Sequence, residues 1–202
     1  MKVLIAVPTY ETISPDTFKS IYDLRTGKHK CQFEFVRGYD CAAARNNIAQ
    51  KALDTEADYV FMVDSDIILP KHALLTLMRG SPEICLGYYR HRTLGELNSE
   101  KSIMYRPGEF NFSMQFFMNE LKEKANQKDP RVEVHGGGLG CALIHTDLFK
   151  KIQKPWFRWI IYPSGDVLSE DLYFCDQCNQ NGIKIYTDAR VNCGHIMPKV
   201  QW

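Results

Sequence analysis

Two aspartates that follow a strongly apolar run have the residue type and spacing of a metal-binding site. Asp64-Ser65-Asp66 comes directly after Tyr59-Val60-Phe61-Met62-Val63, the purest apolar run in the chain. Because side chains alternate along a strand, Asp64 and Asp66 point the same way where the chain leaves the sheet. Two such carboxylates form a half-site for Mg²⁺ or Mn²⁺ that diphosphate oxygens and water complete. An Asp-rich turn is the alternative, but α/β proteins bind ligands at the carboxyl ends of buried strands, which favours a metal site.

A second acidic element, Ser169-Glu170-Asp171-Leu172, begins a predicted helix. One interpretation is structural: Ser169 caps the helix, and the two acids interact favourably with the dipole of its first turn. The other is that a carboxylate of this turn faces the same cleft, as a general base or as a clamp for a substrate hydroxyl. Spacing alone does not separate the two.

His195, in Asn192-Cys193-Gly194-His195, is a candidate third ligand, because imidazole often binds Mn²⁺ or Zn²⁺. A competing hypothesis is a structural zinc site made of Cys175, Cys178, Cys193 and His195. However, Cys175 and Cys178 fall inside a predicted helix, where burial of the thiols explains them without metal.

Short apolar runs alternate with helical patterns from end to end, which predicts one α/β domain over residues 1–202. We expect a mainly parallel, doubly wound sheet flanked by helices, with ligands beyond the carboxyl ends of its strands. Residues 90–111 have no clear period and are expected to form a loop over the site. Strands are predicted at 2–7, 33–36, 59–63, 84–89, 131–134, 141–144 and 183–186. Helices are predicted at 15–24 (closed by Gly27), at 42–53, from Pro70, at 113–127, and from Ser169 to Asn181. In the first of these helices, Ser14 is the expected cap, and the expected apolar face is Phe18, Ile21, Tyr22 and Leu24.

Composition excludes two classes of protein. The 202 residues are 45% hydrophobic, which excludes a disordered chain, and 25 basic against 24 acidic residues exclude a strongly basic polyanion binder. Seven cysteines, an odd number, argue against a disulfide framework and for a reducing compartment. No apolar run approaches the roughly 20 residues of a membrane span. We therefore expect a cytoplasmic protein without a membrane span.

Several short motifs together resemble a known family. They are Val-Pro-Thr-Tyr at 7–10, Ala-Arg-Asn at 44–46, Val-Asp-Ser-Asp at 63–66, Gly-Gly-Gly-Leu-Gly at 136–140, Ser-Glu-Asp at 169–171 and the late His195. In this order and spacing they look like the GT-A-type glycosyltransferases, closest to the family 2-like group. The resemblance spans about 190 residues and implies a single GT-A-like (Rossmann-like) catalytic domain.

The resemblance also implies roles for individual residues. A metal-dependent transferase would move a sugar from a nucleotide-diphosphate sugar to a hydroxyl acceptor, with Mn²⁺ or Mg²⁺ as cofactor and Asp171 as the catalytic base. The metal would be held by Asp64, Asp66 and His195. The donor would be bound by Pro8, Thr9, Tyr10, Glu11, Arg45, Asp64, Ser65 and Asp66. The acceptor would meet Glu170 and the glycine run at Gly137 and Gly138, which lets backbone approach closely.

Aromatic residues before the acidic motif are candidates for stacking on a sugar ring or a base. We expect this role for Trp156, whereas Trp159 and Ile161 are more readily explained as core or hydrophobic cover.

The substrates are less well defined. UDP-sugars are the favoured donors and GDP-sugars the second choice, whereas a glycan, a small molecule or a hydroxylated nucleobase of DNA are all open as acceptors. For DNA, the candidates for a basic rim around the cleft are Arg37, Arg90, Arg92, Lys101 and Arg106, although such charges usually form only a solvated surface. A Mg²⁺-dependent nucleotidyltransferase and a non-catalytic zinc-stabilised binding module are the alternative functions, and stereochemistry and oligomeric state are left open.

Overall fold

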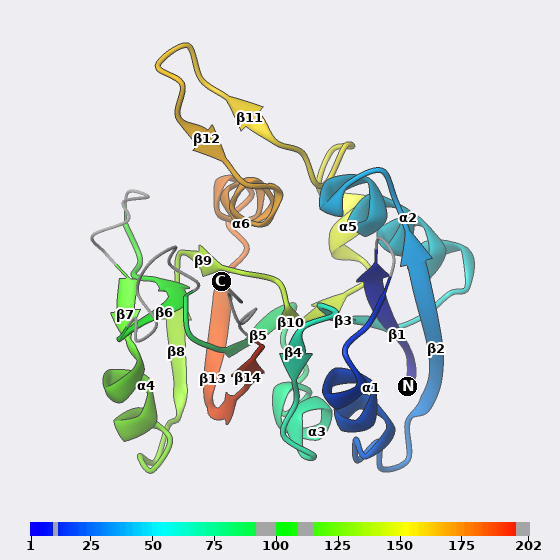
Figure 1. Cartoon of the computed structure of the whole chain (residues 1–202), viewed down its shortest axis with the longest axis vertical. Helices are drawn as coiled ribbons and strands as arrows, with labels where there is room; N and C mark the ends of the chain where they lie inside the picture. Colours follow the sequence, from blue (N-terminus) through cyan, green and yellow to red (C-terminus); the bar gives the residue numbers. More distant parts are fainter. Residues whose placement is uncertain (10–11, 92–99, 109–114, 197–202) are drawn as a thin grey trace, which may run out of the picture.

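The chain begins with a buried strand, as its apolar N-terminal run predicts. In the computed structural model, which describes residues 1–9, 12–91, 100–108 and 115–196, β1 (Lys2–Thr9) is buried from residue 3 to residue 8. Such a run suits a parallel strand covered on both faces. Figure 1 shows β1 inside the sheet, with helices around it.

The central sheet has seven strands, in the order β2-β1-β3-β10-β5-β13-β8. β1 pairs in parallel with β2 and β3, and β5 pairs in parallel with β13, whereas β10 and β8 run antiparallel to their neighbours. Five of the seven strands thus share one direction, which confirms the mainly parallel α/β sheet. The other strands are β2 (Lys30–Arg37), β3 (Tyr59–Val63), β5 (Ile84–Tyr88), β8 (Arg131–Val134), β10 (Cys141–His145) and β13 (Ile185–Asn192).

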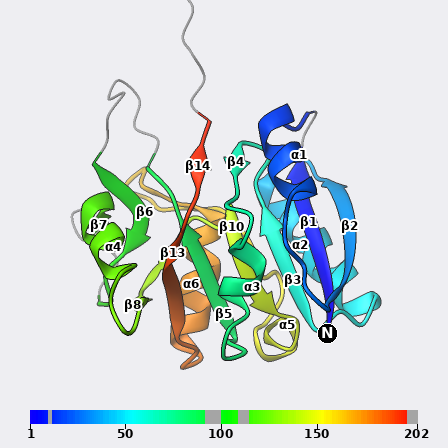
Figure 2. The ribbon, with the colours of Figure 1, turned by 90° about the horizontal axis from the view of Figure 1, so that it is seen from below.

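Helices cover both faces of this sheet and create two hydrophobic layers (Figure 2). Alternate residues of β3 enter opposite layers: Val60 and Met62 join one, whereas Phe61 and Val63 join the other. The first layer is completed by α2 (Cys41–Asp54), α4 (Met118–Lys124), α5 (Leu148–Lys151) and α6 (Glu170–Gln180), and the second by α1 (Pro15–Tyr22) and α3 (Ala73–Leu77). No helix of the described ranges is long and apolar enough to cross a membrane.

Smaller strands lie around the sheet. β4 (Ile67–Ile68) pairs with β14 (Gly194–His195), and β6 (Lys101–Tyr105) lies between β7 (Gln115–Phe117) and β9 (Gly136–Gly137). β11 (Ile160–Ile161) and β12 (Val167–Leu168) form a hairpin that projects away from the remaining elements (Figure 1).

Several sequence predictions need correction. Residues 101–105 form the strand β6 within the expected 90–111 loop, and residues 115–117 form β7 where the 113–127 helix was expected to begin. The last strand starts at Ile185 rather than Ile183, and α3 starts three residues after Pro70. β6 and β7 are strands because they pair with each other, and β6 also pairs with β9, which local periodicity does not reveal.

The first helix matches its predicted buried face only in part. Ser14 caps it, and Ile21 and Leu24 are buried, as expected. Phe18 and Tyr22, however, are 46% and 82% exposed, and Thr17 and Ser20 are buried. Ser20 takes part in the core because its hydroxyl accepts a hydrogen bond from the Leu69 backbone. The helix ends at Tyr22, so its closing residue is not Gly27.

Candidate active site

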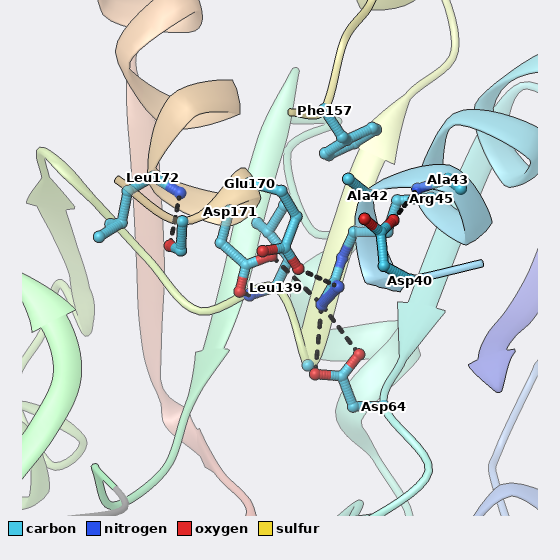
Figure 3. A network of polar contacts seen from close by, with 12 residues as sticks. Asp40, Ala42, Ala43, Arg45, Asp64, Leu139, Phe157, Glu170, Asp171 and Leu172 are labelled. Atoms are coloured by element: carbon cyan, nitrogen blue, oxygen red, sulfur yellow. Dashed lines mark hydrogen bonds and ion pairs between the residues drawn. The ribbon is translucent and has the colours of Figure 1, made fainter. Parts of the chain in front are cut away.

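A buried arginine joins three acidic residues from two distant parts of the sequence. Arg45 Nη2 lies 2.9 Å from Asp64 Oδ1 and 3.3 Å from Asp171 Oδ1, and Nη1 lies 3.0 Å from Glu170 Oε1. The Arg45 side chain is only 1% exposed. Figure 3 shows its guanidinium reaching into the space between the three carboxylates. The arrangement therefore connects the end of β3 with the start of α6.

Two helix caps and one backbone contact position this group. Asp40 accepts a hydrogen bond from the Ala43 N–H and begins α2, from which Arg45 projects. Ser169 caps α6 in the same way and places Glu170 and Asp171 in its first turn. Both caps are of the kind that Asp and Ser provide at helix starts. The structural interpretation of the acidic motif and its placement beside Asp64 are thus compatible.

Burial shifts the pKa values of Arg45 and its acidic partners to different extents. Burial raises the pKa of Asp171 to about 8, against the lowering influence of Arg45 and with a further rise from Glu170 and Asp64. Burial also raises the pKa of Asp64, although Arg45 opposes the rise. For Arg45, burial disfavours the charge, but the three carboxylates together raise its pKa above the ordinary value. Without further positive charge at the site, Asp171 therefore holds a proton at neutral pH.

The glycine-rich segment lies against this group. The Leu139 N–H donates to Asp171 Oδ2 at 3.1 Å, and the Gly140 carbonyl accepts from the Asp64 N–H at 3.0 Å. A Cβ at Gly140 would lie 2.9 Å from Asp64 Oδ2 and 2.7 Å from the Tyr89 hydroxyl, which is too close. Glycine is thus required here by the close approach of Asp64 and Tyr89.

Asp66 and His195 form a neighbouring pair. Antiparallel pairing of β4 with β14 sets His195 opposite Ile67, and the Asp66 carbonyl accepts from the Ile196 N–H at 2.9 Å. His195 Nε2 lies 3.5 Å from Asp66 Oδ2, while its Nδ1 lies 3.0 Å from the Arg90 carbonyl oxygen. If that carbonyl accepts the Nδ1 proton, Nε2 is left as the ligand atom on the side of Asp66.

A cavity of about 180 Å³ opens beside Asp171. Its wall combines polar groups with apolar and aromatic ones: His91, Ser169 and Asp171 on the one hand, and Ile103, Tyr105, Gly138, Val167 and Leu172 on the other. A mixed wall of this kind suits a ring or chain that carries hydroxyl groups.

Five residues differ in exposure from what their predicted roles require. Arg45 and Glu170 are buried against each other, so neither side chain is open to a donor or an acceptor. Trp156 is 2% exposed, and its indole N–H donates to the Phe149 carbonyl in the core. Trp159 and Ile161 are 45% and 74% exposed, the reverse of the expected order. The Trp156 ring packs edge-on against Phe149, with the ring centroids 5.3 Å apart, a contact that the sequence spacing does not reveal.

The remaining predicted residues have the following positions. Pro8 is buried in β1, and the Thr9 hydroxyl donates to the Thr12 carbonyl, while Tyr10 and Glu11 lie outside the described residues. Ser65 accepts a backbone hydrogen bond from Ser14, and Gly137 is packed against Met104. Of the predicted basic rim, Arg92 lies outside the described residues and Arg106 is bound by Glu120 at 2.6 Å.

The predicted zinc set is not assembled. Cys175 and Cys178 belong to the core layer of α6, whereas Cys193 belongs to the layer on the opposite face of the sheet. Within the described parts of the chain, no three His, Cys, Asp or Glu side chains are placed to hold a metal by themselves. These three cysteines are buried thiols, and burial raises the pKa of Cys175 to about 12.

Tyr89 is a site residue that the sequence reasoning missed. Its hydroxyl accepts a hydrogen bond from the Gly140 N–H at 3.0 Å, and its ring packs edge-on against His195 with centroids 5.1 Å apart. The available signal was its position at the end of an apolar strand, which is the edge where ligands bind.

Comparisons with known proteins identify a fold. No family model matches the sequence, and no curated protein matches it. Among solved structures, A197 from STIV is similar over 98% of this chain and 87% of its own, with a TM-score of 0.66 and 18% identity. GalNAc-T7, solved with UDP, GalNAc and Mn²⁺, is similar over 100% of this chain and 45% of its own, with a TM-score of 0.58 and 13% identity.

A third similar structure is that of residues 1–349 of S. aureus TarS in complex with UDP. It matches 96% of this chain and 60% of its own, with a TM-score of 0.53 and 13% identity. This chain therefore spans only about half the length of the GalNAc-T7 and TarS chains, which are GT-A glycosyltransferases. At such identities the similarity concerns the fold alone, and the fold of this chain is GT-A-like.

Proposed function

We propose that this chain is a metal-dependent glycosyltransferase, with residues 1–202 as its catalytic domain. The observation that carries the proposal is the bridge made by Arg45, which holds Asp64 at the end of β3 and Asp171 at the start of α6 on one guanidinium. A site for a charged leaving group and a candidate base therefore lie side by side. The GT-A-like fold supports the proposal.

Asp66 and His195 are the residues that would hold a divalent cation. Their carboxylate oxygen and imidazole nitrogen lie 3.5 Å apart, and both ligand types suit Mn²⁺. Asp64 binds Arg45 but keeps 29% of its side chain exposed, so it adds negative charge beside the pair. When bound, the metal would neutralise the diphosphate that departs from the sugar.

Asp171 is the proposed catalytic base. It removes the proton from an acceptor hydroxyl while the hydroxyl oxygen bonds to the anomeric carbon and the bond from that carbon to the diphosphate breaks. The Leu139 N–H and Arg45 fix its carboxylate at the cavity wall. A base must be unprotonated, and positive charge brought to Asp64 and Asp66 would lower the pKa of Asp171 towards that state.

UDP-sugars are the first donors to test, because GalNAc-T7 and TarS were solved with UDP. Isothermal titration of the full chain with UDP, with and without Mn²⁺, tests the proposal. We expect binding that depends on Mn²⁺ and is lost in Asp66→Ala, whereas Asp16→Ala on exposed α1 serves as the matched control. If neither UDP nor GDP binds in a Mn²⁺-dependent way, the proposal is wrong. Mass spectrometry of the products separates sugar transfer from nucleotidyl transfer.

A further inference from the structure

The hairpin of β11 and β12 presents apolar side chains to solvent. Ile161 is 74% exposed, Val167 51% and Trp159 45%. Asp166 is the one charged residue between 159 and 169, and its carboxylate accepts a hydrogen bond from Ser164 inside the turn. Exposed apolar side chains that are grouped on one element mark interaction sites, whereas singly scattered ones need no explanation.

One face of this hairpin continues into the cavity beside Asp171. Ile161 and Val167 are direct partners across the hairpin, so their side chains share a face. Val167 and Ser169 are two residues apart in extended chain, so their side chains point to the same side of it. Both residues line the cavity. Apolar surface thus leads from Ile161 to Asp171.

The cavity is too small to hold a whole acceptor, so part of the acceptor must contact the surface outside it. Its volume of about 180 Å³ is below the roughly 300–1,000 Å³ of sites that enclose a whole ligand. Only the reacting part of an acceptor fits beside Asp171, and the rest must lie outside. The adjoining surface at Val167 and Ile161 is apolar.

We propose that this hairpin face, defined by Trp159, Ile161 and Val167, binds an apolar group that the acceptor carries next to its reacting part. The acceptor class is then an amphipathic molecule: a hydroxyl-bearing ring that enters the cavity, joined to an alkyl or aryl group. The inference rests on the proposed function, because it assigns the acceptor of the Asp171 site. Each methylene buried on the face tightens binding by up to about fourfold.

Alkyl glucosides of increasing chain length test the inference without turnover. The full chain, labelled with ¹³C in its Ile and Val methyl groups, is titrated with methyl, butyl and hexyl β-D-glucopyranoside below micellar concentrations. We expect the Ile161 and Val167 methyl signals to shift and the dissociation constant to fall at least tenfold from methyl to hexyl. Ile161→Ser/Val167→Ser should abolish this dependence, whereas Phe33→Ser/Phe35→Ser, an exposed pair on β2, should keep it.

Other results would overturn the inference. These are equal affinity for methyl and hexyl glucoside, absence of any hexyl binding at the two methyl signals, or a chain-length dependence that survives Ile161→Ser/Val167→Ser. Binding of the hairpin to phosphatidylcholine vesicles without preference among the glucosides would instead assign the face to a lipid surface. Failure of the proposed function is distinguishable, because Mn²⁺-dependent UDP binding would be missing while the chain-length dependence at the hairpin remained.

Discussion

Replacing Arg45 by methionine should destabilise the protein strongly, because it leaves the buried carboxylates of Asp64 and Glu170 without their common counter-charge. Removing one partner of a buried ion pair typically costs about 3–5 kcal/mol. Glu170 is 5% exposed and bears the full cost, whereas Asp64, at 29%, is partly relieved by water. We therefore expect the free energy of unfolding to fall by about 4 kcal/mol at pH 7. For a chain of this length that corresponds to a drop in Tm of roughly 8–16 °C.

Urea unfolding followed by circular dichroism measures this loss. The loss should shrink at pH 5, because burial raises the pKa of Asp64 and its carboxylate then takes up a proton more readily. It should shrink again when Glu170→Gln is added to Arg45→Met. Arg25→Met is the matched control: Arg25 is exposed, and a surface change of this kind stays within about 0.5 kcal/mol. A loss below about 1 kcal/mol at pH 7, or equal losses with and without Glu170→Gln, would refute the role of Arg45 as the common counter-charge.

Three further predictions concern the same region. The pKa of Asp171 is raised to about 8, so the folded chain keeps a proton that the unfolded chain loses above about pH 4. Without divalent cations, the free energy of unfolding should therefore fall as the pH rises from about 4 to about 8, by at most about 1.4 kcal/mol per pH unit. Urea unfolding at pH 5 and pH 8 should show this fall in the wild type and a smaller one in Asp171→Asn; equal falls would contradict it. Trp156→Ala should cost about 3–5 kcal/mol in thermal unfolding and Trp159→Ala less than about 1 kcal/mol, and the opposite order would show that the core has been misassigned. Gly140→Ala should cost about 1–3 kcal/mol and weaken Mn²⁺-dependent UDP binding, because its methyl group would displace Asp64; unchanged stability and affinity would mean that the close approach is unimportant.

The buried strand β3 and the starts of α1 and α6 were predictable because their signals are local. The buried run of β3 and the Ser169 cap of α6 are each contained in a few residues, and the structure confirms both. Ser14-Pro15 is equally local, and its helix begins as predicted. By contrast, β6 and β7 pair with each other across residues that show no period, so their strands were not predictable from the sequence.

The candidate site could be predicted only in part. Asp64 and Asp171 were singled out separately, by a strand end and a helix start, but their connection through Arg45 spans 125 residues between Arg45 and Glu170 and has no sequence signature. The same limitation explains Trp156, whose burial depends on the backbone carbonyl of Phe149. Residue type identified candidates, whereas tertiary contacts decided which of them face the cavity.

The most direct test of the central claim is release of nucleotide diphosphate from a panel of nucleotide sugars, measured with the full chain, Mn²⁺ and hexyl β-D-glucopyranoside as acceptor. The account predicts release of UDP from at least one UDP-sugar, dependence on Mn²⁺, and a loss of at least about a hundredfold in Asp171→Asn, in line with the typical contribution of a general base. Wild-type rates that equal those of Asp171→Asn for every UDP- and GDP-sugar would contradict it.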